Sequence, residues 1–223
     1  MGVNNKMGYK NLIFLAAAAM LFAAVFPFTA SAEAGAGNPA DHIDLADSYF
    51  VQMRESYAYQ GKPVRPGFQV ESEVVKEKDN GDGTVTRTTY LIVLKKGTDY
   101  SAIFSNNQAI GRASIILTGK GRCSGTLKGN FRIVPAKVAL KTASQQGKKL
   151  TVGYKTVPGG CSYQLAVRKR GSRKWQYAAA GKRSLITKKI TAGRAASVKV
   201  RAYKVVKGKT YYGAWSKAEK IRM

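Results

Sequence analysis

The chain of 223 residues has few of the residue types that most enzymes use for catalysis. It has one histidine, two cysteines and 12 Asp and Glu, against 38 Lys and Arg. Nucleophilic and acid–base catalysis need a positioned base, and a metal needs several His, Cys or carboxylate ligands. The single histidine, His42, lies in a small, polar stretch where we expect an exposed side chain. The sequence therefore predicts no enzyme, no cofactor and no metal site.

The few acidic residues do not match a familiar ligand motif. The run 79–83 has the carboxylates and glycines of a calcium loop, but Tyr90 stands where an EF-hand loop has its bidentate Glu. A hairpin turn accounts for the same residues, because Asn and Gly tolerate positive φ. Asp41, Asp44 and Asp47 could line one helical turn, but we expect them to be solvated. Neither a GxxxxGK[ST] phosphate loop nor paired CxxC zinc ligands occur.

The N-terminus has the pattern of a secretory signal peptide, predicted over residues 1–32. Lys6 and Lys10 precede an apolar stretch over 12–28, and Ala30-Ser31-Ala32 follows as a cleavage site. An uncleaved anchor helix is the alternative. Residues 33–48 are small, polar and acidic, which predicts a flexible leader. No later segment is long and apolar enough to span a membrane, so we expect a secreted protein at the cell surface.

Acidic residues are scarce above all in the C-terminal part of the chain. Residues 136–223 have 23 Lys and Arg but only Glu219, whereas residues 33–135 have 13 Lys and Arg against 11 Asp and Glu. A surface with such an excess attracts polyanions by charge and counterion release. The partners expected outside the cell are an anionic cell-wall polymer, such as teichoic acid, or membrane lipid headgroups. Nucleic acid is not an expected partner in vivo.

Alternating apolar and polar residues predict β-strands along the mature chain. In the run 97–126, strands flank a turn at Ser105-Asn106-Asn107, and Asn80-Gly81-Asp82-Gly83 predicts a hairpin between strands over 69–75 and 84–94. After Pro135, strand candidates recur at 150–154, 163–167, 175–178, 185–190, 197–203 and 211–215. No segment has clear helical periodicity. The predicted fold class is all-β, with two tandem antiparallel, immunoglobulin-like β-sandwich domains over 49–135 and 136–223.

Runs of residues in both predicted domains resemble the sequences of known surface modules. The run 97–126, GTDYSAIFSNNQAIGRASIILTGKGRCSGT, and the run 57–63, YAYQGKP, resemble a bacterial immunoglobulin-like repeat of Gram-positive surface proteins, over about 49–135. The runs 160–167, 172–175, 198–204 and 208–216 resemble a fibronectin type III domain over about 136–223. The two resemblances imply a binding or spacer module. An adhesin or partner-binding module that recognises a protein or glycan is therefore the alternative function.

A candidate polyanion-binding face lies on two strands of the second domain. In the run 198–202 we expect the valines and the alanine to face inward, so that Lys199 and Arg201 face outward. In the run 163–168 the same alternation places Tyr163, Leu165 and Val167 inward and Arg168 outward. The fibronectin type III resemblance implies that these strands are neighbours. The adjoining hairpin extends the face, with Trp175 and Tyr177 interleaved. The predicted face comprises Arg168, Lys169, Arg170, Arg173, Lys174, Lys199 and Arg201.

The two cysteines permit one disulfide, between Cys123 and Cys161. They lie in different predicted domains, so a bridge would lock the domains together. The alternative is two semi-buried thiols that pack as small apolar residues. Cys123 also departs from the immunoglobulin-like repeat, which usually has an aromatic residue at this position.

Overall fold

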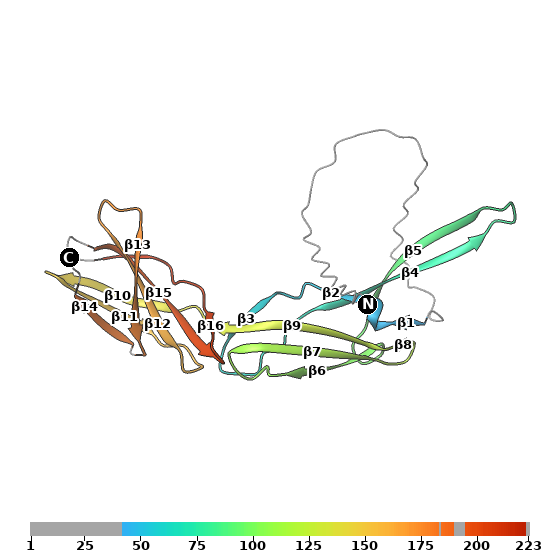
Figure 1. Cartoon of the computed structure of the whole chain (residues 1–223), viewed down its shortest axis with the longest axis horizontal. Coiled ribbons are helices and arrows are strands. Elements are labelled where there is room, and N and C mark those ends of the chain that lie inside the picture. The colour runs from blue at the N-terminus through green and yellow to red at the C-terminus, as the bar shows by residue number, and fades with distance from the viewer. Residues whose placement is uncertain (1–41, 183, 190–194, 222–223) are drawn as a thin grey trace, which may run out of the picture. The chain divides into compact units, whose positions relative to one another are not determined.

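The computed structural model describes residues 42–182, 184–189 and 195–221 (Figure 1). The predicted signal peptide and most of the predicted leader lie outside these residues. The described part consists of β-strands and one short 3-10 helix, which confirms the all-β fold class. No helix within it is long and apolar enough to cross a membrane.

Two sheets built from residues 48–135 pack face to face. One has the order β2-β4-β5 (Ser48–Val51, Gln69–Asp79, Val85–Leu94), and the other has the order β3-β9-β7-β6 (Ser56–Tyr59, Thr126–Pro135, Gly111–Gly119, Tyr100–Ser105). Val70, Ile92 and Leu94 of the first sheet join Ile115 and Leu117 of the second in one buried cluster. This arrangement is a β-sandwich. Its pairings are antiparallel except that of β3 with β9, which is parallel.

The structure confirms both hairpins that the sequence predicts in this sandwich. β4 and β5 pair from Val70 with Leu94 out to Asp79 with Val85, so β4 is longer than expected. In the turn, the Asp79 carboxylate accepts the Gly81 N–H at 2.8 Å, and the Asp82 carboxylate accepts the N–H of the residue two positions on. These bonds to the turn backbone are what a hairpin requires, and they occupy the carboxylates considered for calcium.

The end of the predicted leader is an ordered part of this sandwich, which corrects the prediction for residues 42–48. β1 (Ile43–Asp44) pairs in parallel with β8 (Cys123–Ser124), and η1 (Leu45–Asp47) follows it. Ile43 and Leu45 are 2% and 0% exposed, because they alternate with polar residues and fill the core. The Asp44 carboxylate accepts the Ala46 N–H at 2.9 Å and so caps η1. His42 remains exposed, with Nε2 2.9 Å from the Ser124 hydroxyl.

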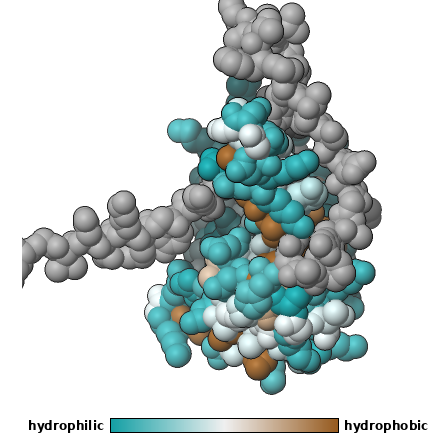
Figure 2. Space-filling model, turned by 90° about the vertical axis from the view of Figure 1, so that its right-hand side faces the viewer, coloured by the Kyte–Doolittle hydropathy of each residue, from teal (hydrophilic) through white to brown (hydrophobic). Residues whose placement is uncertain are grey.

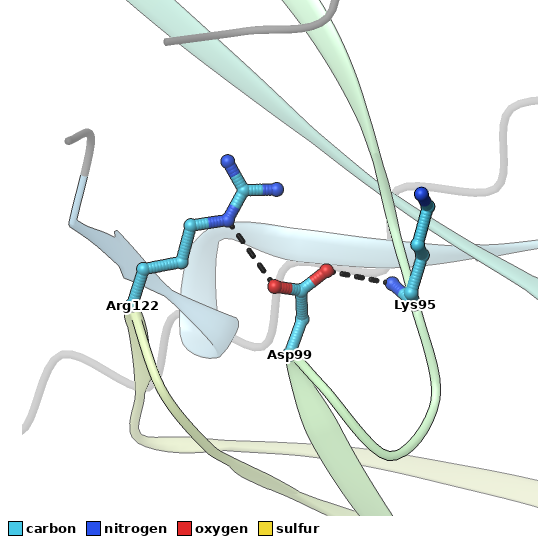
Figure 3. A network of polar contacts seen from close by, with 3 residues as sticks. All are labelled: Lys95, Asp99 and Arg122. Carbon is cyan, nitrogen blue, oxygen red and sulfur yellow. Dashed lines mark hydrogen bonds and ion pairs between the residues drawn. The ribbon is translucent and has the colours of Figure 1, made fainter. Parts of the chain in front are cut away.

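A buried carboxylate organises the corner where β5 leads into β6. The Asp99 side chain is 5% exposed, and it accepts the Lys95 N–H at 2.8 Å and the Arg122 Nε–H at 3.2 Å (Figure 3). The Asp99 carbonyl also accepts the Lys120 N–H at 2.9 Å. One aspartate therefore ties two corners of the chain together. These contacts give a structural reason for the aspartate in the run Gly-Thr-Asp-Tyr at 97–100.

Residues 139–220 form a second pair of sheets. One has the order β10-β11-β14 (Ala139–Gln146, Lys149–Lys155, Leu185–Lys189). The other has the order β13-β12-β15-β16 (Trp175–Gly181, Ser162–Lys169, Ala195–Val206, Lys209–Tyr212), and β17 (Glu219–Lys220) also pairs with β15. Leu150 and Val152 of β11 lie in one buried cluster with Leu165, Val198 and Val200 of the other sheet, again as a β-sandwich.

Most strands of this second sandwich lie close to their predicted positions, but β10 and β17 were not predicted, and β16 spans 209–212 where a strand was predicted over 211–215. β10 carries Lys141 and the polar run Ser144-Gln145-Gln146, which hid its period-two pattern. Gln145 is nevertheless buried, because its side-chain oxygen accepts the Ala195 N–H at 2.8 Å and its amide donates to the Gly147 carbonyl at 2.7 Å. A glutamine in a core position thus replaces an expected apolar residue.

Both cysteines are buried and free in this structure, so the disulfide considered from the sequence is not formed. Cys123 belongs to the core cluster that contains Val70, and Cys161 to the cluster that contains Leu165. Burial raises the pKa of each thiol, and the nearby Asp99 carboxylate adds to the effect at Cys123. Both side chains therefore pack as small apolar residues.

Candidate cation–aromatic site

The register of β12 and β15 confirms that three of the predicted cations share one face of their sheet. Side chains alternate between the two faces of a strand, and residues directly opposite each other lie on the same face. Tyr163, Leu165 and Val200 are buried on the inner face. Three cross-strand pairs define the outer face: Arg168 with Ser197, Ala166 with Lys199, and Gln164 with Arg201.

An irregular segment after β16 brings a tryptophan over this outer face. The Gly213 N–H donates to the Ala202 carbonyl at 2.9 Å, and the Ser216 N–H donates to the Val200 carbonyl at 2.8 Å. The Ser216 hydroxyl in turn accepts the Val200 N–H at 3.0 Å. The segment therefore follows β15 without forming a regular strand, and these bonds fix the position of Trp215 between them.

The outer face carries aromatic rings and cations in alternation. The Lys199 Nζ lies 4.4 Å from the ring centroid of Trp175 and 4.8 Å from that of Trp215. The Arg201 Cζ lies 4.5 Å from the Trp215 centroid and 3.8 Å from that of Tyr212. All four distances are within the range of cation–π attraction, about 6 Å. We call this set the cation–aromatic site: Arg168, Trp175, Lys199, Arg201, Tyr212 and Trp215.

Further polar contacts hold the cations in place. The Arg201 Nε–H donates to the Gln164 side-chain oxygen at 2.8 Å, and Arg168 Nη2 donates to the Ser197 hydroxyl at 3.4 Å. The Arg168 Cζ also lies 5.2 Å from the centroid of Trp175. The charged groups are thus positioned by rings, an amide and a hydroxyl. A planar, positioned guanidinium loses little conformational entropy when it binds an anion.

Little negative charge is available to neutralise the site from within its own sandwich. Glu219 is the only acidic residue of 136–223, and its side chain is exposed on β17. The aromatic rings offer the negative face of their quadrupole but no net charge. The positive field of Arg168, Lys199 and Arg201 therefore extends into solvent, where an external anion can meet it.

The β12–β13 connection carries the remaining predicted cations. Arg170, Arg173 and Lys174 are exposed, and Lys169 is partly buried beside a register shift in the pairing of β12 with β15. The Ser172 hydroxyl accepts the Lys174 N–H at 3.1 Å and shapes the turn. These four residues adjoin Arg168 along the chain. Whether they bind polyanions together with the site stays a prediction.

Sequence reasoning missed two of the rings. Trp175 and Tyr177 were expected among the cations, and the Tyr177 ring does contact that of Trp215, with centroids 5.8 Å apart and planes tilted by 36°. Tyr212 and Trp215 were given no role in the sequence analysis. A strand was expected over 211–215, but in the structure this strand ends at Tyr212. Beyond that point no period-two rule assigns a side chain to a face. The one available signal was the last block that resembles a fibronectin type III domain.

Comparisons with known proteins give no family for this chain. No family model matches it, and no curated protein matches it. Among solved structures, domains A168-A170 from titin are similar, with 13% sequence identity and a TM-score of 0.28. The match covers 74% of this chain and 61% of the titin chain, so the protein spans about three fifths of that structure's length.

Proposed function

We propose that the protein is a secreted, non-catalytic binding protein that associates with the anionic bacterial cell envelope through its basic C-terminal sandwich. The observation that carries the proposal is the cation–aromatic site, where Arg168, Lys199 and Arg201 share one sheet face. Their partners are rings, an amide and a hydroxyl, so an anion can bind them without displacing a carboxylate. Arg and Lys bind phosphate groups by charge-assisted hydrogen bonds.

Patterns in the rest of the sequence support the same proposal. The signal-peptide pattern over 1–32 would deliver the protein outside the membrane. The resemblances to a bacterial immunoglobulin-like repeat and to a fibronectin type III domain fit a surface protein. With a net charge of +2 over residues 33–135, the first sandwich would be left free of the envelope. Teichoic acid and anionic lipid headgroups share phosphate chemistry and are the two candidate sources.

The proposal is tested by sedimentation of the full protein with purified Gram-positive walls, with and without teichoic acid, and with vesicles of anionic phospholipid, across a salt series. We expect binding that requires teichoic acid or the anionic lipid and that weakens as salt rises, because bound phosphates release counterions. Retention that does not depend on salt would contradict an electrostatic attachment. Absence of binding to any of the three at low salt would overturn the proposal.

A matched pair of variants tests whether position matters beyond net charge. Arg170→Gln/Arg173→Gln/Lys174→Gln removes three exposed cations beside the site, without touching the rings. Lys148→Gln/Lys149→Gln/Lys155→Gln removes three exposed cations from the other sheet. We expect binding about tenfold weaker for the first variant than for the second, since charge near the bound polymer counts most. Equal losses would show that net charge alone is responsible.

A further inference from the structure

The outer face of the β2-β4-β5 sheet is the second unusual surface of the described residues. Val70, Ile92 and Leu94 bury the inner face of this sheet in the core, whereas the end of the β4–β5 hairpin, from Glu77 to Arg87, is exposed on both faces. Strand alternation then places the odd-numbered residues of β2, β4 and β5 on the outer face. We call this surface the acidic outer face, and its charged residues and most exposed apolar residues are Tyr49, Glu71, Glu73, Val75, Glu77, Asp79, Val85, Arg87, Leu91 and Val93.

Large apolar side chains are exposed on this face. Leu91, Val75 and Val85 are 56%, 55% and 54% exposed, and Val93 and Tyr49 are 47% and 41% exposed. Figure 2 shows hydrophobic residues among hydrophilic ones on the side where β4 and β5 lie in Figure 1. A single exposed valine is ordinary, but several on one open sheet face mark a surface that another molecule covers.

The same face is rich in carboxylates. Glu71, Glu73, Glu77 and Asp79 line β4, and Arg87 is the one cation of the face, 2.7 Å from Glu77. Partial burial raises the pKa of Tyr49, and the nearby Glu71 and Glu73 carboxylates add to the effect, so these carboxylates act on the same part of the surface. An apolar strand beside an acidic strand is complementary to a surface that carries both rings and cations.

We propose that the acidic outer face binds the cation–aromatic site, together with the adjoining exposed cations Arg170 and Arg173, of a second copy of the chain. The carboxylates of β4 would meet the cations around Arg168, and the aliphatic residues of β5 would meet exposed rings such as Tyr177, which is 59% exposed. The argument for this occupant is complementarity of charge and of surface type between two faces of one chain. The two faces differ, so the contact is heterologous and repeats from copy to copy.

The size of the face sets the expected strength of the contact. β5 has 10 residues, and a strand of that length extends over about 33 Å. Two strands of about this length and the four-residue β2 offer less than the roughly 800 Å² per partner of a stable complex, so we expect weak association, in the micromolar range. The net charge of +26 repels copies at low salt, and screening over about 10 Å at 0.1 M leaves only the local contact to act.

The test is sedimentation velocity of the full protein without walls, lipids or other polyanions. At about 0.1 M salt we expect a sedimentation coefficient that rises with protein concentration, and Glu71→Lys/Glu73→Lys should abolish the rise. Asp47→Lys/Glu55→Lys is the matched control, because both residues are exposed acids outside the face and the change in charge is equal. A wild-type protein that stays monomeric overturns the proposal, and so does an equal loss in the control.

Mixing two variants provides the sharper outcome. Glu71→Lys/Glu73→Lys keeps the basic surface, and Arg170→Glu/Arg173→Glu keeps the acidic one. Each variant alone should be monomeric, whereas their mixture should form one-to-one dimers and nothing larger, since only one productive contact remains. A mixture without dimers overturns the proposal. Envelope binding by Glu71→Lys/Glu73→Lys should equal that of the wild type, so failure of this inference leaves the proposed function standing, and the reverse also holds.

Discussion

The two sandwiches differ in the main partners of their positive charges, although the first also has two single cation–π contacts, Arg54 with Tyr57 and Lys76 with Tyr90. In the first, guanidinium groups meet carboxylates at 2.7 to 3.2 Å, in the pairs Arg87 with Glu77, Arg122 with Asp99 and Arg132 with Glu55. In the second, Lys199 and Arg201 lie over aromatic rings. In an ion pair the carboxylate neutralises the charge of the cation, whereas an aromatic ring stabilises a cation without neutralising it. A surface can therefore be ordered and still be strongly positive.

Removal of the buried carboxylate should have the largest effect on stability. Asp99→Ala leaves the Lys95 N–H and the Arg122 guanidinium without their acceptor in a corner where the carboxylate is 5% exposed. We expect a loss of about 3 kcal/mol in the free energy of unfolding, because a backbone N–H and a guanidinium group that is only 24% exposed both lose their charged acceptor. Urea unfolding followed by circular dichroism measures the change, because both tryptophans, Trp175 and Trp215, lie in the other sandwich.

The exposed pair of Arg87 and Glu77 provides the control for Asp99. Its side chains are 73% and 53% exposed, so water and salt screen the attraction. Glu77→Ala should change the unfolding free energy by at most about 0.5 kcal/mol. Similar losses for Asp99→Ala and Glu77→Ala would show that burial does not decide the worth of these ion pairs.

The sequence predicted the frame of the first sandwich well, because its turns have distinctive residues. Asn80 to Gly83 specified the β4–β5 hairpin, and Asn106, with φ of 56°, lies in the β6–β7 connection as expected of asparagine. The error at residues 42–48 has a physical cause. Ile43 and Leu45 are only two apolar residues among polar neighbours, and their burial depends on β8, which lies about 80 positions later in the chain.

The candidate site was only half predictable, for a similar reason. Alternation within a strand assigned Lys199 and Arg201 to the outer face, and the register agrees. Trp215 reaches that face through hydrogen bonds of Gly213 and Ser216 to β15, which no local pattern specifies. The alternation of residues in β4 and β5 is visible in the sequence. The sequence does not show, however, whether another part of the chain covers the outer face of these strands.

Loss of the central ring should have the second-largest effect. Trp215→Ala removes the aromatic partner that Lys199 and Arg201 share and leaves both cations with one ring each. We expect a loss of about 2 kcal/mol in unfolding free energy, from two cation–π contacts and the packing of a partly buried ring. Tyr177→Ala is the control, since this ring contacts Trp215 but is 59% exposed. It should cost less than about 1 kcal/mol, and a larger loss than for Trp215 would contradict the alternating arrangement.

Removal of the Lys199 charge while the packing is kept should have the smallest effect on the unfolding free energy. It should also show most clearly that the two sandwiches stabilise their cations in different ways. In Lys199→Met an unbranched apolar chain can remain between Trp175 and Trp215, and repulsion from Arg201 disappears. These changes oppose each other, so the unfolding free energy should shift by less than about 1 kcal/mol and respond little to salt. Lys148→Met, in the exposed β10–β11 turn, sets the size of an ordinary surface change. A loss as large as that of Asp99→Ala would mean that Lys199 is held by its charge, as Arg122 is, and the contrast between the two sandwiches would fail.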